Sequence, residues 1–245
     1  MTVVLMLGSA PMALEAAVWP RSFDRVVAIN NAWRVRPDWD FSIYPWDFPP
    51  ERVAVPAGEQ VLVTEAEFVP AQNRYGGFVY AGATMAYTAA YWVLDALRPR
   101  VLAVFGCDMH YPPGQTHFYG AGTADPLRAD ITLRSLEAKS VRLMVMAAHQ
   151  GCAVVNLSIG PSRLLCPRAK LSDLAGVRAL EFDPVRVQAA QAREAELAYF
   201  APSGRYWEDL SRYDLAEIDA LDALWLACLP EPLGLRLGAE PESAL

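Results

Sequence analysis

Residues 3–11 read VVLMLGSAP, a continuous apolar run that ends in small residues and a proline. An unbroken apolar run is typical of a strand buried on both faces, as in a parallel sheet. Proline favours the first turn of a helix, because its fixed φ suits the helix and its missing N–H is not needed there. The stretch therefore predicts a buried strand, a tight loop and the start of a helix.

The same kind of apolar run returns further along the chain. The runs are 24–31 (DRVVAINN), 41–44, 60–64, 100–108 (RVLAVFGCD) and 152–158 (CAVVNLS). Amphipathic stretches of helical length lie between them at 81–97 and 133–150. Strands that alternate with helices imply right-handed crossovers and a parallel sheet. We therefore expect an α/β fold, a Rossmann-like and mainly parallel sheet with helices on both faces.

The composition changes near residue 183. Residues 185–200 (VRVQAAQAREAELAYF) and 215–229 are rich in Ala, Leu and Glu at helical spacing. We divide the chain into a sheet domain, 1–182, and a helical C-terminal extension, 183–245. The extension is expected to pack on the main domain or on a neighbouring subunit, in which case its helices would hold a homo-oligomer together.

The charges of the chain exclude one large class of partner. There are 21 Lys and Arg against 28 Asp and Glu, which gives a net charge of −7. This balance does not favour a broad basic face, so no nucleic-acid partner is expected. The longest apolar stretch, 81–94, is shorter than the roughly 18 to 20 residues that a bilayer requires, so we expect no transmembrane segment. No positively charged segment precedes the first apolar run, and a cytoplasmic location is expected.

The four cysteines are predicted to be free, buried thiols. They form no CxxC pair, and no histidine stands at ligand spacing from them; they are Cys107, Cys152, Cys166 and Cys228. The pattern supports neither a zinc site nor a disulfide framework, and no tightly bound cofactor is expected.

In an open parallel sheet, ligands bind beyond the carboxyl ends of the strands, so the residues there are the candidate site. Gly8 and Ser9 follow the first strand, where small residues let a ligand approach and the next helix offers N–H groups to a phosphate. An ordinary βα turn would have the same residues. Asn30 and Asn31 follow the second strand, where their amides could contact a base or a sugar. Two consecutive Asn residues equally suit a turn.

The run at 100–108 leads into the richest group of polar residues. Asp108 and His110 come at its end, and His117 follows a Pro-Pro-Gly turn. Histidine takes and gives protons near neutral pH, so His117 is a candidate catalytic base. Either histidine could instead cap a loop by hydrogen bonding. Asp108 could bind a ribose or a metal, or simply hold its loop together.

The stretch 69–85 (VPAQNRYGGFVYAGATM) combines amides, an arginine and glycines ahead of a helix. A helix that starts at Gly82 would present its N-terminus to the ligand crevice. Arg74 could neutralise a phosphate or a carboxylate. The paired glycines in this stretch also suit an ordinary flexible turn.

Aromatic residues gather after the second strand, at Trp33, Trp39, Tyr44, Trp46 and Phe48. Their rings could stack on a sugar or a base. Filling the core between the loops and the sheet is the preferred interpretation.

The order of these motifs resembles that of the bacterial CMP-sialic-acid-dependent sialyltransferases that build lipooligosaccharide. Their superfamily includes motility accessory factors and 6-hydroxymethylpterin diphosphokinase-like proteins. The similarity covers roughly residues 1–165, and it rests on the order of short motifs. In chain order these are Gly8 to Pro11, Phe23-Asp24 with Asn30, Gly82 with Met85, Gly106 with Asp108, His117 to Gly120, and Leu136-Glu137.

The resemblance implies a metal-independent glycosyltransferase. The donor substrate would be a CMP-type nucleotide sugar with a sialic-acid-like sugar, and the acceptor would be a hydroxyl compound. His117 stands where the family has its general base, which takes the acceptor proton as the hydroxyl attacks the anomeric carbon and inverts it. His110 stands where the family has a tyrosine that binds the departing phosphate. The expected nucleotide contacts are Gly8, Ser9, Asn30, Asn31, Gly82, Asp108 and His110.

Two other functions stay open at this point. A diphosphokinase-like enzyme of the same superfamily would use Mg²⁺ near Asp108, and a chelator would silence it. A non-catalytic protein would keep the fold and a nucleotide-binding or assembly role, with the helical extension as its assembly element.

Overall fold

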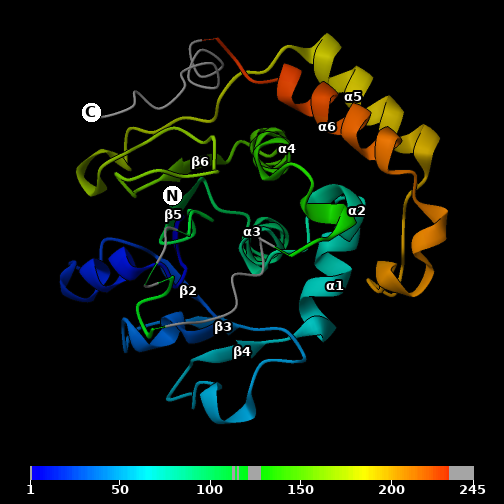
Figure 1. Cartoon of the computed structure of the whole chain (residues 1–245). Helices are drawn as coiled ribbons and strands as arrows, with labels where there is room; N and C mark the ends of the chain where they lie inside the picture. Colours follow the sequence, from blue (N-terminus) through cyan, green and yellow to red (C-terminus); the bar gives the residue numbers. More distant parts are fainter. Residues whose placement is uncertain (1, 112–113, 115, 121–127, 232–245) are drawn as a thin grey trace.

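The computed structural model describes residues 2–111, 114, 116–120 and 128–231. Within them, six parallel strands form one sheet in the order β4-β3-β2-β1-β5-β6 (Figure 1). They are β1 (Val3–Leu7), β2 (Arg25–Ile29), β3 (Phe41–Ile43), β4 (Val61–Val63), β5 (Val101–Phe105) and β6 (Ala153–Asn156). Every strand lies inside one of the apolar runs of the sequence, which confirms the α/β class and the parallel sheet.

β1 lies at the centre of the sheet, between β2 and β5. Leu7 pairs with Ala28 on one side and with Phe105 on the other, so the three strands end at nearly the same level. The chain runs outward through β2, β3 and β4, and then crosses over to β5 and β6. The direction of winding therefore changes between β1 and β5, which is where open α/β sheets form their ligand crevice.

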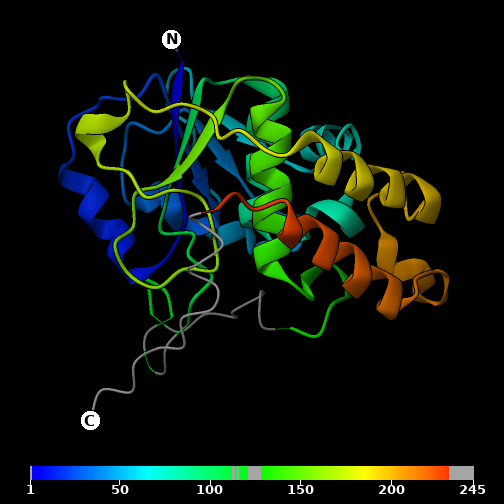
Figure 2. The same ribbon diagram turned by 90° about the horizontal axis from the view of Figure 1, so that it is seen from above.

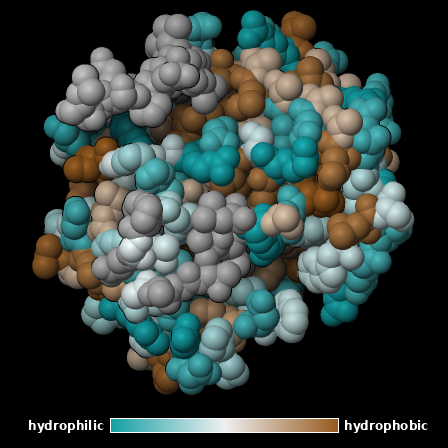
Figure 3. All heavy atoms as spheres, in the orientation of Figure 1, coloured by the Kyte–Doolittle hydropathy of each residue, from teal (hydrophilic) through white to brown (hydrophobic). Residues whose placement is uncertain are grey.

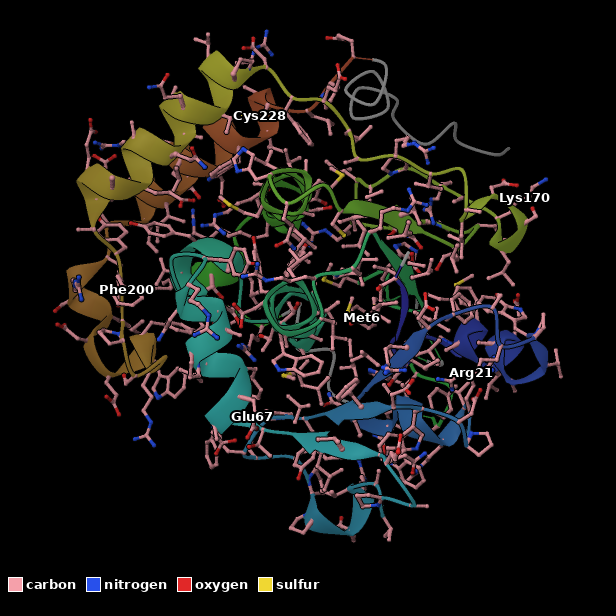
Figure 4. All side chains as sticks on the ribbon, turned by 180° about the vertical axis from the view of Figure 1, so that it is seen from behind. Met6, Arg21, Glu67, Lys170, Phe200 and Cys228 are labelled. Atoms are coloured by element: carbon pink, nitrogen blue, oxygen red, sulfur yellow. The ribbon has the colours of Figure 1, made fainter. Side chains whose placement is uncertain are left out.

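The two faces of the sheet are covered by different kinds of helix (Figures 1 and 2). One face carries the α-helices of the sheet domain, which are α1 (Glu65–Asn73), α2 (Phe78–Ala81), α3 (Met85–Ala96) and α4 (Leu136–Ala148). The other face carries loops and 3₁₀ helices, of which Pro11–Val18 is the longest. Neighbouring residues of β1 alternate between the two faces: Met6 packs toward α3 (Figure 4), and Leu5 packs on the opposite side.

The expected helix over 81–97 begins at Met85. Thr84 is its N-cap, and the side-chain oxygen of Thr84 accepts a hydrogen bond from the N–H of Tyr87 at 3.2 Å. Gly82 has a φ of +88°, a non-helical value that ends α2 and separates it from α3. The helix N-terminus thus lies three residues beyond the position expected from the glycine.

α1 is a helix that the periodicity of the sequence does not indicate. Its start is a capping box, in which the backbone N–H of Thr64 donates to the carboxylate of Glu67 at 2.8 Å. Pro70 lies inside this helix and removes one of its hydrogen-bond donors. Burial of Phe68 in the core beside α3 stabilises the helix in spite of this proline.

The C-terminal extension packs on α4. Its helices, α5 (Pro184–Leu197) and α6 (Leu215–Ala227), follow the helical stretches of the sequence, and a 3₁₀ segment, η7 (Tyr206–Arg212), lies between them. Val187 and Trp225 belong to the same hydrophobic core as residues of β1, α3 and α4. Packing on the main domain is therefore present, whereas assembly through these helices stays a prediction.

Two buried ion pairs fasten the extension to α4. Nζ of Lys139 lies 2.7 Å from a carboxylate oxygen of Asp222, and both side chains are almost fully buried. Nε of Arg142 lies 2.6 Å from a carboxylate oxygen of Glu194. Burial alone would lower the pKa of the Arg142 guanidinium, but Glu194 and the hydroxyl of Tyr91 raise it well above its usual value. Arg142 stays charged inside the protein because Glu194 of the extension and Tyr91 of α3 face it.

The four cysteines are buried and unpaired, as the sequence predicts. Burial raises the pKa of the Cys152 and Cys166 thiols to about 12, so they are unreactive at neutral pH. No helix in the described part of the chain has the length and apolar character needed to cross a bilayer.

Gly8 is the position at which a single methyl group should disturb the sheet most directly. A Cβ on Gly8 would overlap the carbonyl oxygen of Gly106 and lie 2.6 Å from Sγ of Cys107. We expect Gly8→Ala to lower the free energy of unfolding by about 1–3 kcal/mol, the usual cost of overpacking. Urea unfolding measures the difference. Gly160→Ala is the control, since nothing lies near its Cβ and its expected change is within about 0.5 kcal/mol.

Candidate active site

A cavity of about 120 Å³ lies at the carboxyl ends of β1, β2 and β5. We call it the strand-end cavity. It is lined by Gly8, Ser9, Ala10, Ile29, Asn30, Thr84, Met85, Ala86, Gly106, Cys107, Asp108, Met109, His110, Tyr111, His117 and Tyr119. The structure thus brings six of the expected site residues together, namely Gly8, Ser9, Asn30, Asp108, His110 and His117.

The loop after β1 is tied to the end of β5. The N–H of Gly8 donates to the carbonyl of Phe105 at 2.8 Å, and the N–H of Ala10 donates to the carbonyl of Gly106 at 3.0 Å. These two N–H groups are therefore used within the protein. The loop forms a wall of the cavity, and a phosphate would have to be bound mainly by other groups.

The N-terminus of α3 supplies such groups. Thr84, Met85 and Ala86 line the cavity, and the N–H groups of Met85 and Ala86, at the start of the helix, have no i−4 carbonyl partner within it. The helix dipole adds a partial positive charge at this end. The first turn of α3 is therefore the best-placed anion site of the cavity.

Asn30 faces this helix end with an unusual backbone. Its φ is +53°, a left-handed value that a residue other than glycine adopts at a cost. Its side-chain Oδ1 is buried and has no hydrogen-bond partner among the described residues. Met109, on the β5 side of the cavity, also has a positive φ of +52°. Strained residues of this kind cluster at functional sites, because the surrounding structure must hold them in place.

Asn31 is turned away from the strand-end cavity. It is buried in the first turn after β2 and does not line the cavity, although it follows Asn30 directly. Gly82 does not line it either. A Cβ on Gly82 would lie 2.9 Å from the ring of Tyr87, so this glycine serves the close packing between α2 and α3.

His117 is held in a short turn above the cavity. Its N–H donates to the carbonyl of Gly120 at 3.2 Å, and the N–H of Phe118 donates to the carbonyl of Ser9 at 3.0 Å. The hydroxyl oxygen of Thr116 lies 2.8 Å from Nδ1 of His117. The imidazole also stacks on the ring of Tyr119, with 4.9 Å between the ring centroids. The turn and the hydroxyl together fix the orientation of the ring.

Asp108 is bonded within the protein. One carboxylate oxygen accepts from the side-chain amide of Asn156 at 2.8 Å, and the other accepts from the hydroxyl of Ser158 at 2.6 Å. A guanidinium nitrogen of Arg168 lies 3.7 Å from the same carboxylate. Asp108 therefore links the ends of β5 and β6, while the exposed His110 two residues later remains at the rim of the cavity.

Arg74 lies at the other end of α3. Its guanidinium forms a two-bonded pair with Asp95, at 2.6 and 2.5 Å, near the C-terminus of that helix. The sequence predicts that Arg74 neutralises a phosphate or a carboxylate; in the structure it pairs with the carboxylate of Asp95 and does not line the strand-end cavity. The described residues that line the strand-end cavity include no Lys or Arg. A positive partial charge at this cavity comes from the N-terminus of α3.

A second and larger cavity of about 540 Å³ adjoins the first at Met85. We call it the extension cavity, since residues 203–207 of the extension form one of its walls. The rest comes from the loop after β3, from α1 and α2, from the start of α3 and from residues 128 and 130. Figure 3 shows apolar surface in the region of α2 and the extension. Figure 4 shows Phe200 of the extension beside α1 and α2.

The sequence predicts that a helix N-terminus faces the ligand crevice, and the structure places that N-terminus at Met85. A signal for this start is present in the sequence, because Thr84 precedes an apolar helix, as an N-cap does. No local signal indicates the extension cavity, because its walls come from segments far apart in the chain.

Searches against protein-family models, curated proteins and solved structures found no match to this chain.

Proposed function

We propose that the protein is a glycosyltransferase-like enzyme that transfers a sugar from a CMP-type nucleotide donor to a hydroxyl acceptor. The sugar would be sialic-acid-like, and the reaction would be metal-independent and inverting. The observation that carries the proposal is the meeting of three features around one cavity: His117, the first turn of α3, and the Oδ1 of Asn30, which has no hydrogen-bond partner within the described ranges. The proposed location is the cytoplasm, where buried free thiols such as these stay reduced.

The donor is assigned to the strand-end cavity by its phosphate. The N–H groups of Met85 and Ala86 would bind the phosphate oxygens, and the partial positive charge of the helix end would stabilise the charge that builds up as the nucleotide leaves. His110 at the rim would add a further hydrogen bond. Asn30 would bind the nucleoside through its side-chain amide.

The proposed reaction has one proton acceptor and one leaving group. The acceptor oxygen attacks the anomeric carbon from the face opposite the phosphate, and a new C–O bond forms. The bond from the anomeric carbon to the phosphate oxygen breaks, and CMP leaves with the bonding electron pair. His117 takes the acceptor proton, which makes the hydroxyl a stronger nucleophile.

Thr116 has a defined part in this scheme. With Nδ1–H of His117 donating to the Thr116 hydroxyl oxygen, the lone pair needed for proton transfer is on Nε2. The bond at Nδ1 then sets both the tautomer and the direction of the ring, as a partner of a catalytic histidine commonly does.

Nucleotide binding is the first test, and Asn30→Gly is its sharpest variant. Glycine accepts the positive φ of this position, so the fold should be unharmed while the amide is lost. We expect CMP at about 100 times its dissociation constant to stabilise the wild type by about 2.7 kcal/mol in thermal unfolding. The variant should bind CMP about tenfold more weakly, as for the loss of one hydrogen bond. Equal affinity in the two proteins would remove Asn30 from the site.

The diphosphokinase alternative is less favoured, because both oxygens of Asp108 are hydrogen-bonded within the protein. Among the described residues, no three Asp, Glu, His or Cys side chains form a cluster that could hold a metal ion. We expect the transfer of sugar from a CMP donor to proceed at an unchanged rate in excess chelator. A rate that falls to background in chelator and returns with Mg²⁺ would contradict the metal-independent reaction, and Mg²⁺-dependent transfer of diphosphate from ATP with no transfer of sugar would favour the kinase.

A further inference from the structure

The extension cavity has the features of a binding site that is separate from the strand-end cavity. Its volume of about 540 Å³ lies in the range typical of sites for small molecules. Of the seven tryptophans, all of them in the described part of the chain, two are exposed, and both line this cavity. Trp46 is 72% exposed and Trp207 is 50% exposed. Exposed apolar surface that gathers at one cavity is typical of a binding site.

The wall formed by the extension is rigidly held. The hydroxyl of Tyr206 donates to the carboxylate of Asp130 at 2.6 Å, and the same carboxylate accepts from the N–H of Thr132 at 2.8 Å. Burial opposes the ionisation of Asp130, but these hydrogen bonds outweigh it and lower the pKa of the carboxyl. The charge therefore persists at neutral pH and keeps Tyr206, and with it Trp207, in place.

Gly204 brings the extension close to α1 and α2. A Cβ at this position would lie 2.9 Å from the ring of Phe78 and 3.2 Å from a methyl group of Val69. The φ of +76° also favours glycine at this position. This close approach of the backbone to Phe78 and Val69 closes the cavity on the extension side. The extension and the sheet domain are therefore in direct contact at the wall of the cavity.

The lining separates into an apolar floor and a charged rim. The floor is made of Ala66, Phe68, Val69, Phe78, Ala83 and Met85. The charged side chains of the lining are Asp47, Glu65, Arg128, Asp130 and Arg205, and Thr88, Ser203 and Tyr206 add hydroxyl groups. A free sugar needs hydrogen bonds on most of its edges, and this floor offers none from side chains. An aromatic ring can lie on the floor and between the tryptophans, with a polar end directed to the rim.

We propose that the extension cavity binds an aromatic ring of the acceptor, which would then be an aryl-bearing alcohol. That the ring belongs to the acceptor rests on the proposed function; the binding of an aromatic ring in this cavity does not. Because the two cavities adjoin at Met85, a hydroxyl attached to the ring by a short link would reach toward the strand-end cavity.

Calorimetry on the full chain without nucleotide tests the proposal, with three uncharged probes. They are 2-naphthylmethanol, its fully saturated counterpart and maltose. We expect 2-naphthylmethanol to bind, the saturated alcohol to bind at least about threefold more weakly, and maltose to give no heat, because the cavity selects aromatic rings. Trp207→Ala and Trp46→Ala should each weaken 2-naphthylmethanol binding about tenfold.

Leu210→Ala is the matched control, because Leu210 lies on η7, is 51% exposed and does not line the cavity. We expect it to leave the affinity unchanged. Tryptophan variants that bind as tightly as wild type, or maltose binding that depends on the tryptophans, would overturn the proposal, and so would equal affinity for the aromatic and saturated alcohols. Binding of 2-naphthylmethanol by a protein that fails to bind CMP would support this cavity and overturn the proposed function alone.

Discussion

His117→Ala is expected to lower the rate of sugar transfer by a factor of about 10²–10⁴ and to leave CMP affinity nearly unchanged. The variant loses the group that takes the acceptor proton, while the anion site at the start of α3 and the side chain of Asn30 remain. Steady-state release of CMP gives the rate, and calorimetry gives the affinity. Donor hydrolysis should fall with transfer, because water needs the same base.

His149→Ala is the control for this substitution. His149 is an exposed residue at the C-terminal end of α4 and does not line the strand-end cavity. We expect it to have wild-type turnover. A His117→Ala enzyme that turns over at the wild-type rate would refute the assignment of His117 as base. A parallel loss of CMP affinity and turnover would place the histidine in donor binding instead.

Lys139→Met is expected to lower the free energy of unfolding by about 3–5 kcal/mol, the cost of leaving a buried charge without its partner. Asp222 would stay buried, and its second carboxylate oxygen already lacks a hydrogen-bond partner among the described residues. Urea unfolding followed by circular dichroism measures the change. Exposed pairs contribute little, so Arg134→Ala, which breaks the surface pair with Asp219 between the same parts of the fold, should cost at most about 1 kcal/mol.

The loss of unfolding free energy in Lys139→Met should depend on pH. Burial raises the pKa of Asp222 even with the lysine present, and removal of the cation raises it further. A carboxyl whose pKa is higher in the folded than in the unfolded protein stabilises the fold while it is protonated. This contribution is fully present at pH values below the unfolded pKa and is lost as the pH rises through the folded pKa. Lys139→Met should thus be less destabilised at pH 5 than at pH 8.

A double variant separates the missing charge from the changed packing. In Lys139→Met with Asp222→Leu, both charges are gone and most of the volume is kept, so stability should recover most of the loss. No recovery would mean that the defect is one of packing.

The sheet could be predicted from the sequence because its information is local. Each parallel strand is buried on both faces, so it appears as an apolar run such as Val3–Leu7, and the residue after each run marks the edge where ligands bind. Ser9, Asn30 and His117 were found in this way, and the structure brings all three to one cavity.

The remaining errors have physical causes that local sequence does not contain. Asn30 and Asn31 are identical neighbours, but Asn30, which has a left-handed φ, lines the cavity and Asn31 does not. The sequence predicts a phosphate or a carboxylate beside Arg74, and it does not indicate that the carboxylate is that of Asp95 at the far end of α3. Such outcomes depend on how segments pack, which periodicity does not report.

The extension cavity is the clearest case of a feature beyond local reasoning. Trp46 follows β3 and Trp207 belongs to the extension, and nothing in either segment indicates that they share a cavity. The sequence favoured a core role for the aromatic residues after the second strand. This holds for Trp39, which is buried, and is wrong for Trp46.

Amide NMR during titration with CMP tests most directly the claim that the first turn of α3 binds the donor phosphate. We expect the Met85 and Ala86 amide signals to move with CMP and much less with cytidine, which lacks the phosphate. The amides of Leu215 and Ala216, at the start of α6, serve as the comparison and should stay in place in both titrations. Signals of Met85 and Ala86 that remain unchanged at saturating CMP, or that move equally with cytidine, would contradict the claim.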